Sequence, residues 1–185
     1  MDKEKRNKIL IVVLSFSIGV LIYLLFRSRN LFYYQFIEML SLDSAVDKVR
    51  VIVWEKRSYI PNWVIYSLPD GLWMFSMGIA LLHNRIFYRE IQKVYNVIYA
   101  SFFIFEFVQW GFGGHGTFLG TFDKMDLLFF TVGFFFASTI GEREWKRKLQ
   151  KNIEMNTKEQ YQREKRKTLI IVIVFTVLGF FPALV

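Results

Sequence analysis

Residues 9–26 read ILIVVLSFSIGVLIYLLF, a run of eighteen residues without a charged side chain. As an α-helix with a rise of about 1.5 Å per residue, this run extends for about 27 Å, close to the roughly 30 Å hydrocarbon core of a bilayer. The segment after it, Arg27-Ser28-Arg29-Asn30, has no small-x-small cleavage site, and the run is longer than the apolar region of a typical signal peptide. We therefore expect an uncleaved transmembrane helix here.

Four further apolar runs follow, separated by polar segments. We predict an all-α fold, a polytopic transmembrane bundle of about five spans in one integral membrane domain, with spans near residues 9–26, 66–83, 94–112, 124–140 and 168–185. The composition agrees, because 54% of the residues are hydrophobic, 21 are Phe and the mean hydropathy is +0.29, too apolar for an ordinary soluble domain. The chain has no cysteine, which excludes a disulfide framework and thiolate chemistry.

The net charge of +8 comes from Lys and Arg residues that lie between the apolar runs. Seventeen of the 24 lie in residues 1–8, 84–93 and 141–167, which share one side of the membrane if the spans alternate. The positive-inside rule predicts a multi-pass protein of the cell membrane with a cytoplasmic N-terminus and an outer C-terminus. The same charges favour membrane lipid as a partner and require no nucleic acid.

Two connecting segments are long enough to have structure of their own. Residues 141–167 are rich in Lys, Arg, Glu and Gln, which is typical of a charged cytoplasmic loop with some helix. In the outer segment 31–67, the apolar residues of 43–54 recur at helical spacing and predict an interfacial helix on the outer membrane surface. A short strand at 51–53 is the competing interpretation.

Glu106 is the most informative position, because it interrupts the apolar sequence of the third span. A carboxyl group inside a membrane costs roughly 2.5–3.5 kcal/mol near the helix centre and less near the interface, so such groups are commonly functional. A polar stripe accompanies it along one helical face: Gln92, Asn96, Tyr99 and Gln109. The alternative is a structural Glu106 that joins helices by hydrogen bonds.

Three Asp residues stand at the outer starts of helices. Asp123 can cap the fourth span, with Thr121 as the alternative cap, and Asp126 then lies in the first turn, where the helix dipole favours a negative charge. Asp70 opens the second span, where Ser67 and Asp70 can form a capping box with Pro69 in the first turn. Because the loop from Gly111 to Gly120 is short, we also expect Glu106, Gln109, Asp123 and Asp126 to share one pocket, with Asp70 at its rim.

The same loop carries His115, a further candidate ligand-binding residue. Together with the carboxylates it could hold a hard divalent cation, although no tight metal-ligand spacing is present. The sequence has no P-loop, dinucleotide fingerprint or Ser–His–Asp spacing, so it identifies no cofactor.

Glu106-x-x-Gln109, the glycine-rich loop, Gly120-Thr121-Phe122-Asp123-x-x-Asp126 and Gly133 resemble the C-terminal signature of the VanZ-like membrane proteins, over about residues 68–140. Asp70 resembles the Asp that opens an earlier helix in that family. The chain departs from the family pattern at two positions, with Gly120 in place of an Arg and Phe130 in place of an Asn. The resemblance implies a divergent member of a family of small polytopic proteins tied to low-level glycopeptide (teicoplanin) resistance, and it supplies no reaction.

Two classes of function follow from these residues. The first is an outer-face carboxylate pocket that binds or acts on a lipid-linked or cell-envelope ligand, with Glu106 as acid or base and Asp123 and Asp126 as orienting groups. The second is a non-enzymatic membrane protein that binds another membrane protein or modulates the envelope, its carboxyls being structural.

The predicted topology has a direct test. Because the spans alternate, reporter domains fused after residue 155 and at the C-terminus should report opposite sides of the membrane, with residue 155 cytoplasmic. A periplasmic or extracellular phosphatase and a cytoplasmic fluorescent protein provide complementary signals. The same side for both fusions would contradict the topology.

Overall fold

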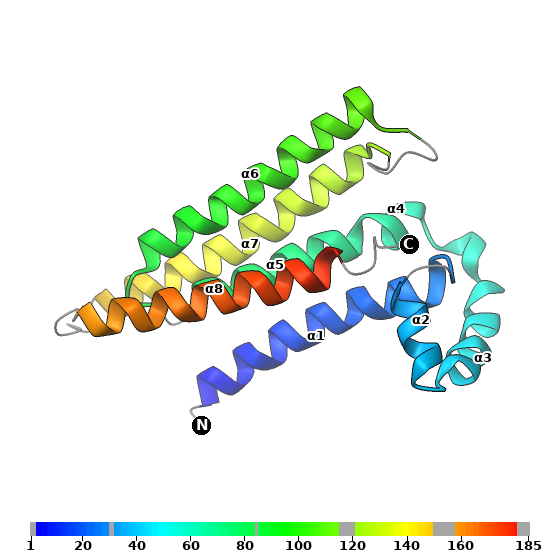
Figure 1. Ribbon diagram of the computed structural model, residues 1–185, viewed down its shortest axis with the longest axis horizontal. Helices are drawn as coiled ribbons and strands as arrows, with labels where there is room; N and C mark the ends of the chain where they lie inside the picture. The colour runs from blue at the N-terminus through cyan, green and yellow to red at the C-terminus, as the bar shows by residue number, and fades with distance from the viewer. Residues whose placement is uncertain (1–2, 30–31, 84, 115–120, 150–157, 181–185) are drawn as a thin grey trace.

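The fold is all-α in the part of the chain that the computed structural model describes, residues 3–29, 32–83, 85–114, 121–149 and 158–180. No strand occurs in these ranges, which confirms the predicted fold class (Figure 1). The elements in chain order are α1 Lys3–Phe26, α2 Phe32–Met39, α3 Asp43–Trp54, a 3-10 turn Arg57–Tyr59, α4 Asn62–Tyr66, α5 Leu68–Leu82, α6 Tyr88–Phe112, α7 Lys124–Leu149 and α8 Lys158–Phe180.

Each predicted span corresponds to one long helix, but four of these helices extend further into charged sequence. α1 begins at Lys3 and α6 at Tyr88, and α7 continues to Leu149, nine residues beyond the predicted end at 140. α8 begins at Lys158, so much of the described sequence between 141 and 167 is helical. Lys, Arg, Glu and Gln are good helix formers, so the helix continues after the apolar residues end.

α5 is the short helix of the bundle, with 15 residues. The predicted span at 66–83 corresponds to the last residue of α4 and to α5, because the helix is interrupted at Ser67. Pro69 explains the break: it has no N–H to donate, and its ring would clash with the carbonyl of residue 65 in a continuous helix.

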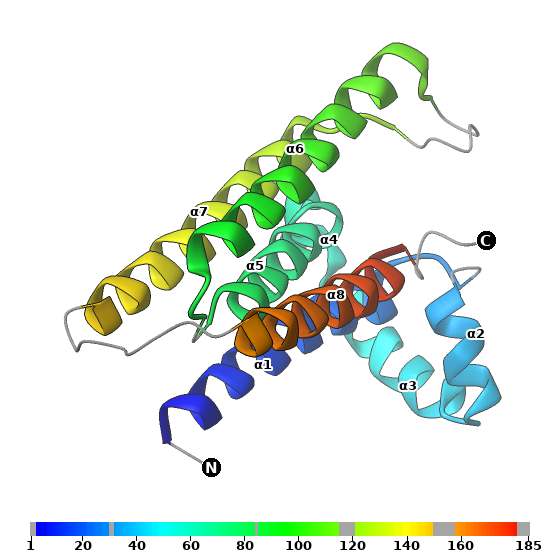
Figure 2. The same ribbon diagram turned by 60° about the vertical axis from the view of Figure 1, so that its left-hand side comes forward.

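α3 covers the predicted helix 43–54, and the alternative strand at 51–53 is wrong. α2 was not predicted, and together with α3 it folds back against the end of α1 (Figure 2). The buried Arg50 guanidinium donates to the carbonyls of Leu24 (2.5 Å) and Arg27 (3.0 Å), and Trp54 Nε1 donates to the carbonyl of Leu25 at 2.8 Å. α3 thus supplies donors to the last carbonyls of α1, which have no partner within their own helix.

α2 and α3 are fastened to each other and to the segment after α1. The Tyr34 hydroxyl donates to Asp47 Oδ1 at 2.5 Å, and Arg29 pairs with the same oxygen at 2.9 Å. Burial raises the pKa of the Tyr34 phenol, and the neighbouring Asp47 carboxylate adds to this shift, so the phenol stays protonated and donates at neutral pH. Residues 32–67 are therefore ordered, as the sequence indicates.

α5 is the central helix and contacts α1, α6, α7 and α8. Its closest neighbour is α7, which it meets backbone to backbone: a Cβ added to Gly133 would lie 2.3 Å from the Gly71 carbonyl oxygen. Farther along, Gly78 lies against Ala137 and Leu82 against Gly141. The residue numbers rise together on both helices, so α5 and α7 are parallel and begin at the same end of the bundle.

The opposite end of the bundle is held by ionic contacts. Lys8 of α1 and His83 at the end of α5 both pair with the buried Glu144 of α7, with 2.8 Å between His83 Nδ1 and Glu144 Oε2. Glu164 of α8 accepts hydrogen bonds from the backbone N–H groups of Ile86 and Phe87 at 3.4 and 3.2 Å. These contacts fix the turn before α6 against α8.

Two of the described helices are long and apolar enough to cross a membrane on length and composition, over Arg6–Phe26 and Lys124–Arg147. α5 is apolar but shorter. These two helices are weak support for association with a membrane, because length and composition are the only criteria that they meet.

The contact between α5 and α7 predicts a sharp difference between two glycines. Gly133→Ala should lower the free energy of unfolding by about 1–3 kcal/mol, because the added methyl group would overlap the α5 backbone. Gly111→Ala is the matched control, since nothing lies within 4 Å of its added Cβ. Unfolding of both variants in detergent, followed by circular dichroism, measures the difference, and equal stability would contradict the proposed packing.

Candidate functional site

Asp70 and Asp126 lie at one end of the bundle, in the first turns of the parallel helices α5 and α7. Glu106 lies in the last two turns of α6, which runs in the opposite direction and so ends where α7 begins. Asp126 lies within electrostatic range of both other carboxyls. The structure therefore brings together the three residues that we call the acidic cluster: Asp70, Glu106 and Asp126.

Of the two capping predictions, the one for Asp123 is confirmed and the one for Ser67 and Asp70 is wrong. Asp123 caps α7, because its Oδ1 accepts a hydrogen bond from the backbone N–H of Met125 at 2.8 Å, so Thr121 is not the cap. The capping box predicted for Ser67 and Asp70 is wrong: Ser67 has helical backbone angles, φ −106° and ψ −33°, and makes no side-chain cap. Capping thus explains Asp123 and does not explain Asp70.

Glu106 faces the interior of the bundle. It is 5% exposed, whereas the other residues of the last four turns of α6 are half-buried or exposed. The backbone N–H of Asp123 is within hydrogen-bonding range of its carboxylate, and Asp126 acts on the carboxylate electrostatically. The predicted polar stripe continues this contact down α6, with Tyr99 at 2.9 Å from Thr131 and Gln92 at 3.1 Å from Ser138, both on α7.

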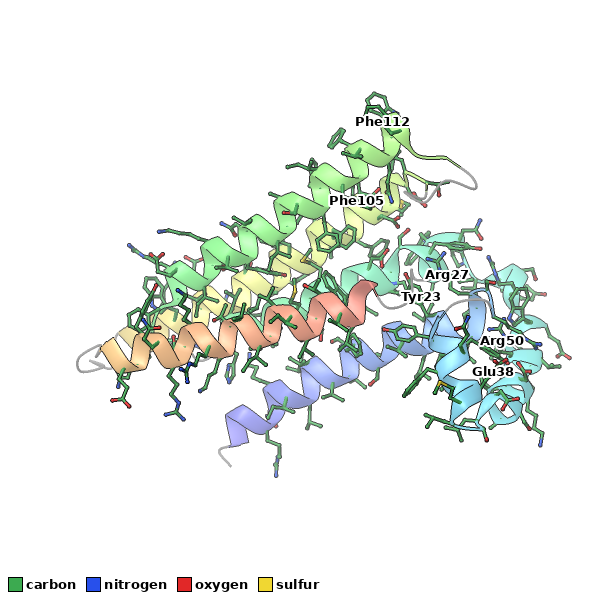
Figure 3. All side chains as sticks on the ribbon, viewed as in Figure 1. Tyr23, Arg27, Glu38, Arg50, Phe105 and Phe112 are labelled. Atoms are coloured by element: carbon green, nitrogen blue, oxygen red, sulfur yellow. The ribbon has the colours of Figure 1, made fainter. Side chains whose placement is uncertain are left out.

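The side chain of Arg27, the residue after the end of α1, lies close to the acidic cluster. The Tyr23 hydroxyl donates to Asp70 Oδ1 at 3.3 Å, and Arg27 donates to that hydroxyl oxygen, also at 3.3 Å. The Arg27 guanidinium lies 4.8 Å from the Tyr23 ring centroid and 4.9 Å from that of Tyr66. Figure 3 shows Tyr23 and Arg27 together at this junction between α1 and the start of α5. Two carboxyl groups of the cluster, those of Asp70 and Asp126, thus lie within electrostatic range of this one guanidinium.

The hydrogen-bond network of this region is incomplete. Four buried polar atoms have no hydrogen-bond partner among the described residues: Arg27 Nε, Ser67 Oγ, Glu106 Oε2 and Asp126 Oδ1. Ser67 lies beside Asp126, but the two do not complete a bond of good geometry. A buried polar atom without a partner costs about 1–3 kcal/mol, so four in one place leave capacity for a bound polar group.

Two further residues were predicted to line the pocket. Gln109 lies one helical turn beyond Glu106 and is half-buried. His115 lies outside the described residues. Within the described ranges, no group of three His, Asp or Glu side chains is arranged to hold a metal ion.

Sequence reasoning missed Tyr23, Arg27 and Ser67 as members of this region. Tyr23 and Arg27 are spaced i,i+4 at the end of the first apolar run, so they share a helix face, and this spacing was the available signal. Ser67 was predicted only as a helix cap, because its place beside Asp126 depends on the break between α4 and α5.

We compared the chain with protein-family models, with curated proteins and with solved structures, and none of them matches it.

The contact of Arg27 with the acidic cluster predicts an energetic coupling. Arg27→Met should lower the free energy of unfolding by about 3 kcal/mol, because it leaves partly buried carboxylates without their cation. Adding Asp70→Asn should restore at least about 1 kcal/mol, since one of the repelling charges is then gone. Arg29→Met is the control: Arg29 is exposed and paired at the surface, where the loss should stay below about 1 kcal/mol. Asp70→Asn is also measured alone, and strictly additive effects of Arg27→Met and Asp70→Asn in denaturant unfolding would refute the coupling.

Proposed function

We propose that this chain is a VanZ-like integral membrane protein in which α1, α5, α6, α7 and α8 cross the cell membrane, with the N-terminus in the cytoplasm. The outward faces of four of these helices support this, because they expose large apolar side chains along their length, which is rare in a soluble protein. The exposed set is Ile9, Leu10, Val13, Leu14, Ile18 and Leu21 on α1; Val94, Val97, Phe103, Ile104, Phe105 and Phe107 on α6; Leu128, Val132, Phe135 and Phe136 on α7; and Leu169, Ile170, Ile173, Val174 and Val177 on α8.

The packing of α5 and α7 also favours a bilayer. Helices that associate in lipid gain little from hydrophobic burial, so small residues that allow close backbone approach dominate their interfaces. Gly71 and Gly133 meet in this way, and Ala137 and Gly141 continue the small-residue face of α7 at intervals of four.

The α2–α3 unit fits the outer membrane surface. Apolar side chains are exposed on both helices and on the turn between them: Phe36, Met39, Leu40, Leu42, Val49, Val51 and Ile52. Helices that present apolar residues on one side and charges on the other lie in the interfacial plane. This unit therefore belongs to the same side as the acidic cluster, next to the lipid headgroups.

The acidic cluster is the part of the molecule that we assign to function: it binds or acts on a lipid-linked or cell-envelope ligand. The observation that carries this assignment is the buried Glu106, whose Oε2 has no hydrogen-bond partner among the described residues and faces the equally incomplete Asp126. Glu106 is placed to accept a hydrogen bond from a ligand or to exchange a proton with it, while Asp126 and Asp70 orient the ligand. Asp123, whose side chain caps α7, acts through its backbone N–H.

A second function has its own observation. The last turn of α6 exposes Trp110 and Phe112, and Figure 3 shows Phe112 projecting from the tip of the helix. Such a surface suits a non-enzymatic protein that binds another membrane protein, in which case the carboxyls hold the helices together.

Glu106→Gln separates these functions, because it keeps the shape of the side chain and removes its ionisation. Lipids that co-purify with the detergent-solubilised protein are identified by mass spectrometry and compared with the bulk membrane lipid. We expect at least a tenfold loss of the enriched species in the variant, since a hydrogen bond to a charged group contributes about 1.5–3 kcal/mol. Glu90→Gln, which changes an exposed Glu on the same helix, is the control. Identical lipid profiles in wild type and Glu106→Gln would favour the protein-binding function.

A further inference from the structure

A cavity lies inside the bundle beside the acidic cluster. Its empty space, counted together with its opening, amounts to about 540 Å3. All five long helices contribute to an apolar wall that includes Phe16, Val20, Trp73, Phe102, Phe130 and Leu178. Tyr23 and Asp70 also line the cavity, so one end of its wall reaches the hydrogen bond that joins these two side chains beside the acidic cluster.

The other polar side chains of the wall are already occupied. The Tyr33 hydroxyl donates to the carbonyl of Leu178 at 2.7 Å, and Trp73 Nε1 donates to the carbonyl of Phe175 at 3.0 Å. Both bonds go to the backbone of α8, so these two side chains present mainly their rings to the cavity. A guest in the body of the cavity therefore meets hydrocarbon, and its polar part must lie at the Tyr23–Asp70 end.

The cavity is elongated along the helices. Phe16 and Tyr23, seven residues apart on α1, both line it, which corresponds to about 10 Å along the helix axis. Phe16 lies on the side of Tyr23 that faces away from the acidic cluster. The space thus leads inward from the cluster and suits a hydrocarbon chain whose headgroup remains at the cluster.

The charges next to the Tyr23–Asp70 end of the cavity select the headgroup. Arg27 is positive and its buried Nε has no hydrogen-bond partner among the described residues, which suits a phosphate oxygen. Glu106 Oε2 and Asp126 Oδ1 are buried acceptors that lack donors among the described residues, which suits an ammonium group. A headgroup with a phosphate and no amine would leave both of these acceptors without a donor.

We propose that the cavity holds one hydrocarbon chain of a phospholipid that has a primary amine in its headgroup, with the phosphate at Arg27 and the ammonium at the acidic cluster. This inference rests on the proposed ligand site and names the class of ligand that the site takes.

Photo-crosslinking tests the chain and the headgroup separately. Two probes carry a diazirine in the acyl chain, one with a phosphatidylethanolamine and one with a phosphatidylglycerol headgroup, each diluted into phosphatidylcholine vesicles that contain the full chain. Labelled peptides are mapped by mass spectrometry. We expect the ethanolamine probe to label the cavity residues Phe16, Trp73 and Phe102 at least fivefold more than the glycerol probe, whereas both label the outward-facing Leu14 and Val97 equally.

Gly19 provides a matched pair of variants, because it lines the cavity and an added Cβ would make only ordinary contacts, at 3.5 Å or more, with Pro69. Gly19→Leu extends into the cavity and should reduce labelling of cavity residues at least fivefold, while Gly19→Ala should leave it unchanged. Unchanged labelling of Leu14 shows that the variant is inserted and folded. If Gly19→Leu does not fold, the ratio of the two probes on the wild type decides alone.

Three outcomes would overturn the inference: no labelling of cavity residues by either probe, equal cavity labelling by both, or labelling that survives Gly19→Leu in a folded protein. The proposed function fails separately. Amine-selective cavity labelling together with identical lipid profiles for wild type and Glu106→Gln would keep the chain site and remove the role of Glu106. Absent cavity labelling together with a lipid loss in Glu106→Gln would keep the ligand site and remove the chain site.

Discussion

The direct backbone contact of α5 with α7 at Gly71 and Gly133 determines the geometry of the acidic end. Because the two helices are parallel and meet in this register, their first turns lie side by side, and Asp70 and Asp126 come within electrostatic range of each other. A larger residue at either glycine would separate the helices and the two carboxyls with them. The close packing that membrane helices use for association therefore also creates a like-charge repulsion that the rest of the site must offset.

Helix dipoles offset part of this repulsion, and they set Glu106 apart. Asp70 and Asp126 lie at helix N-termini, where a negative charge is favoured, and Arg27 follows the C-terminus of α1, where a positive charge is favoured. Glu106 lies near the C-terminus of α6, where the dipole opposes a negative charge. Its position is thus the one that neither capping nor dipole explains. A buried acceptor in this position is better explained by a ligand than by helix stability, because an apolar residue would pack there at lower cost.

The sequence predicted the features that depend on local pattern. The five apolar runs, the helix at 43–54, the Asp123 cap and the meeting of Glu106 with Asp126 follow from periodicity, helix-start signals and a short loop. It failed where position depends on contacts between distant segments. Ser67 looked like a cap and is not one, because the end of α4 holds it in helical angles. The role of Arg27 was not predicted, because its partners Asp70 and Tyr66 are about forty residues away in the chain.

The α2–α3 unit supports the site from the end of α1. The last carbonyls of α1 have no donors within their own helix. Arg50 and Trp54 supply those donors, and one of the Arg50 bonds goes to the carbonyl of Arg27 itself. The backbone that presents Arg27 and Tyr23 to Asp70 is therefore held by α3, and the bond from Tyr34 to Asp47 joins α3 to α2. Disturbing α3 would displace the cation that offsets Asp70, so α3 supports the site although its side chains do not enter the cluster.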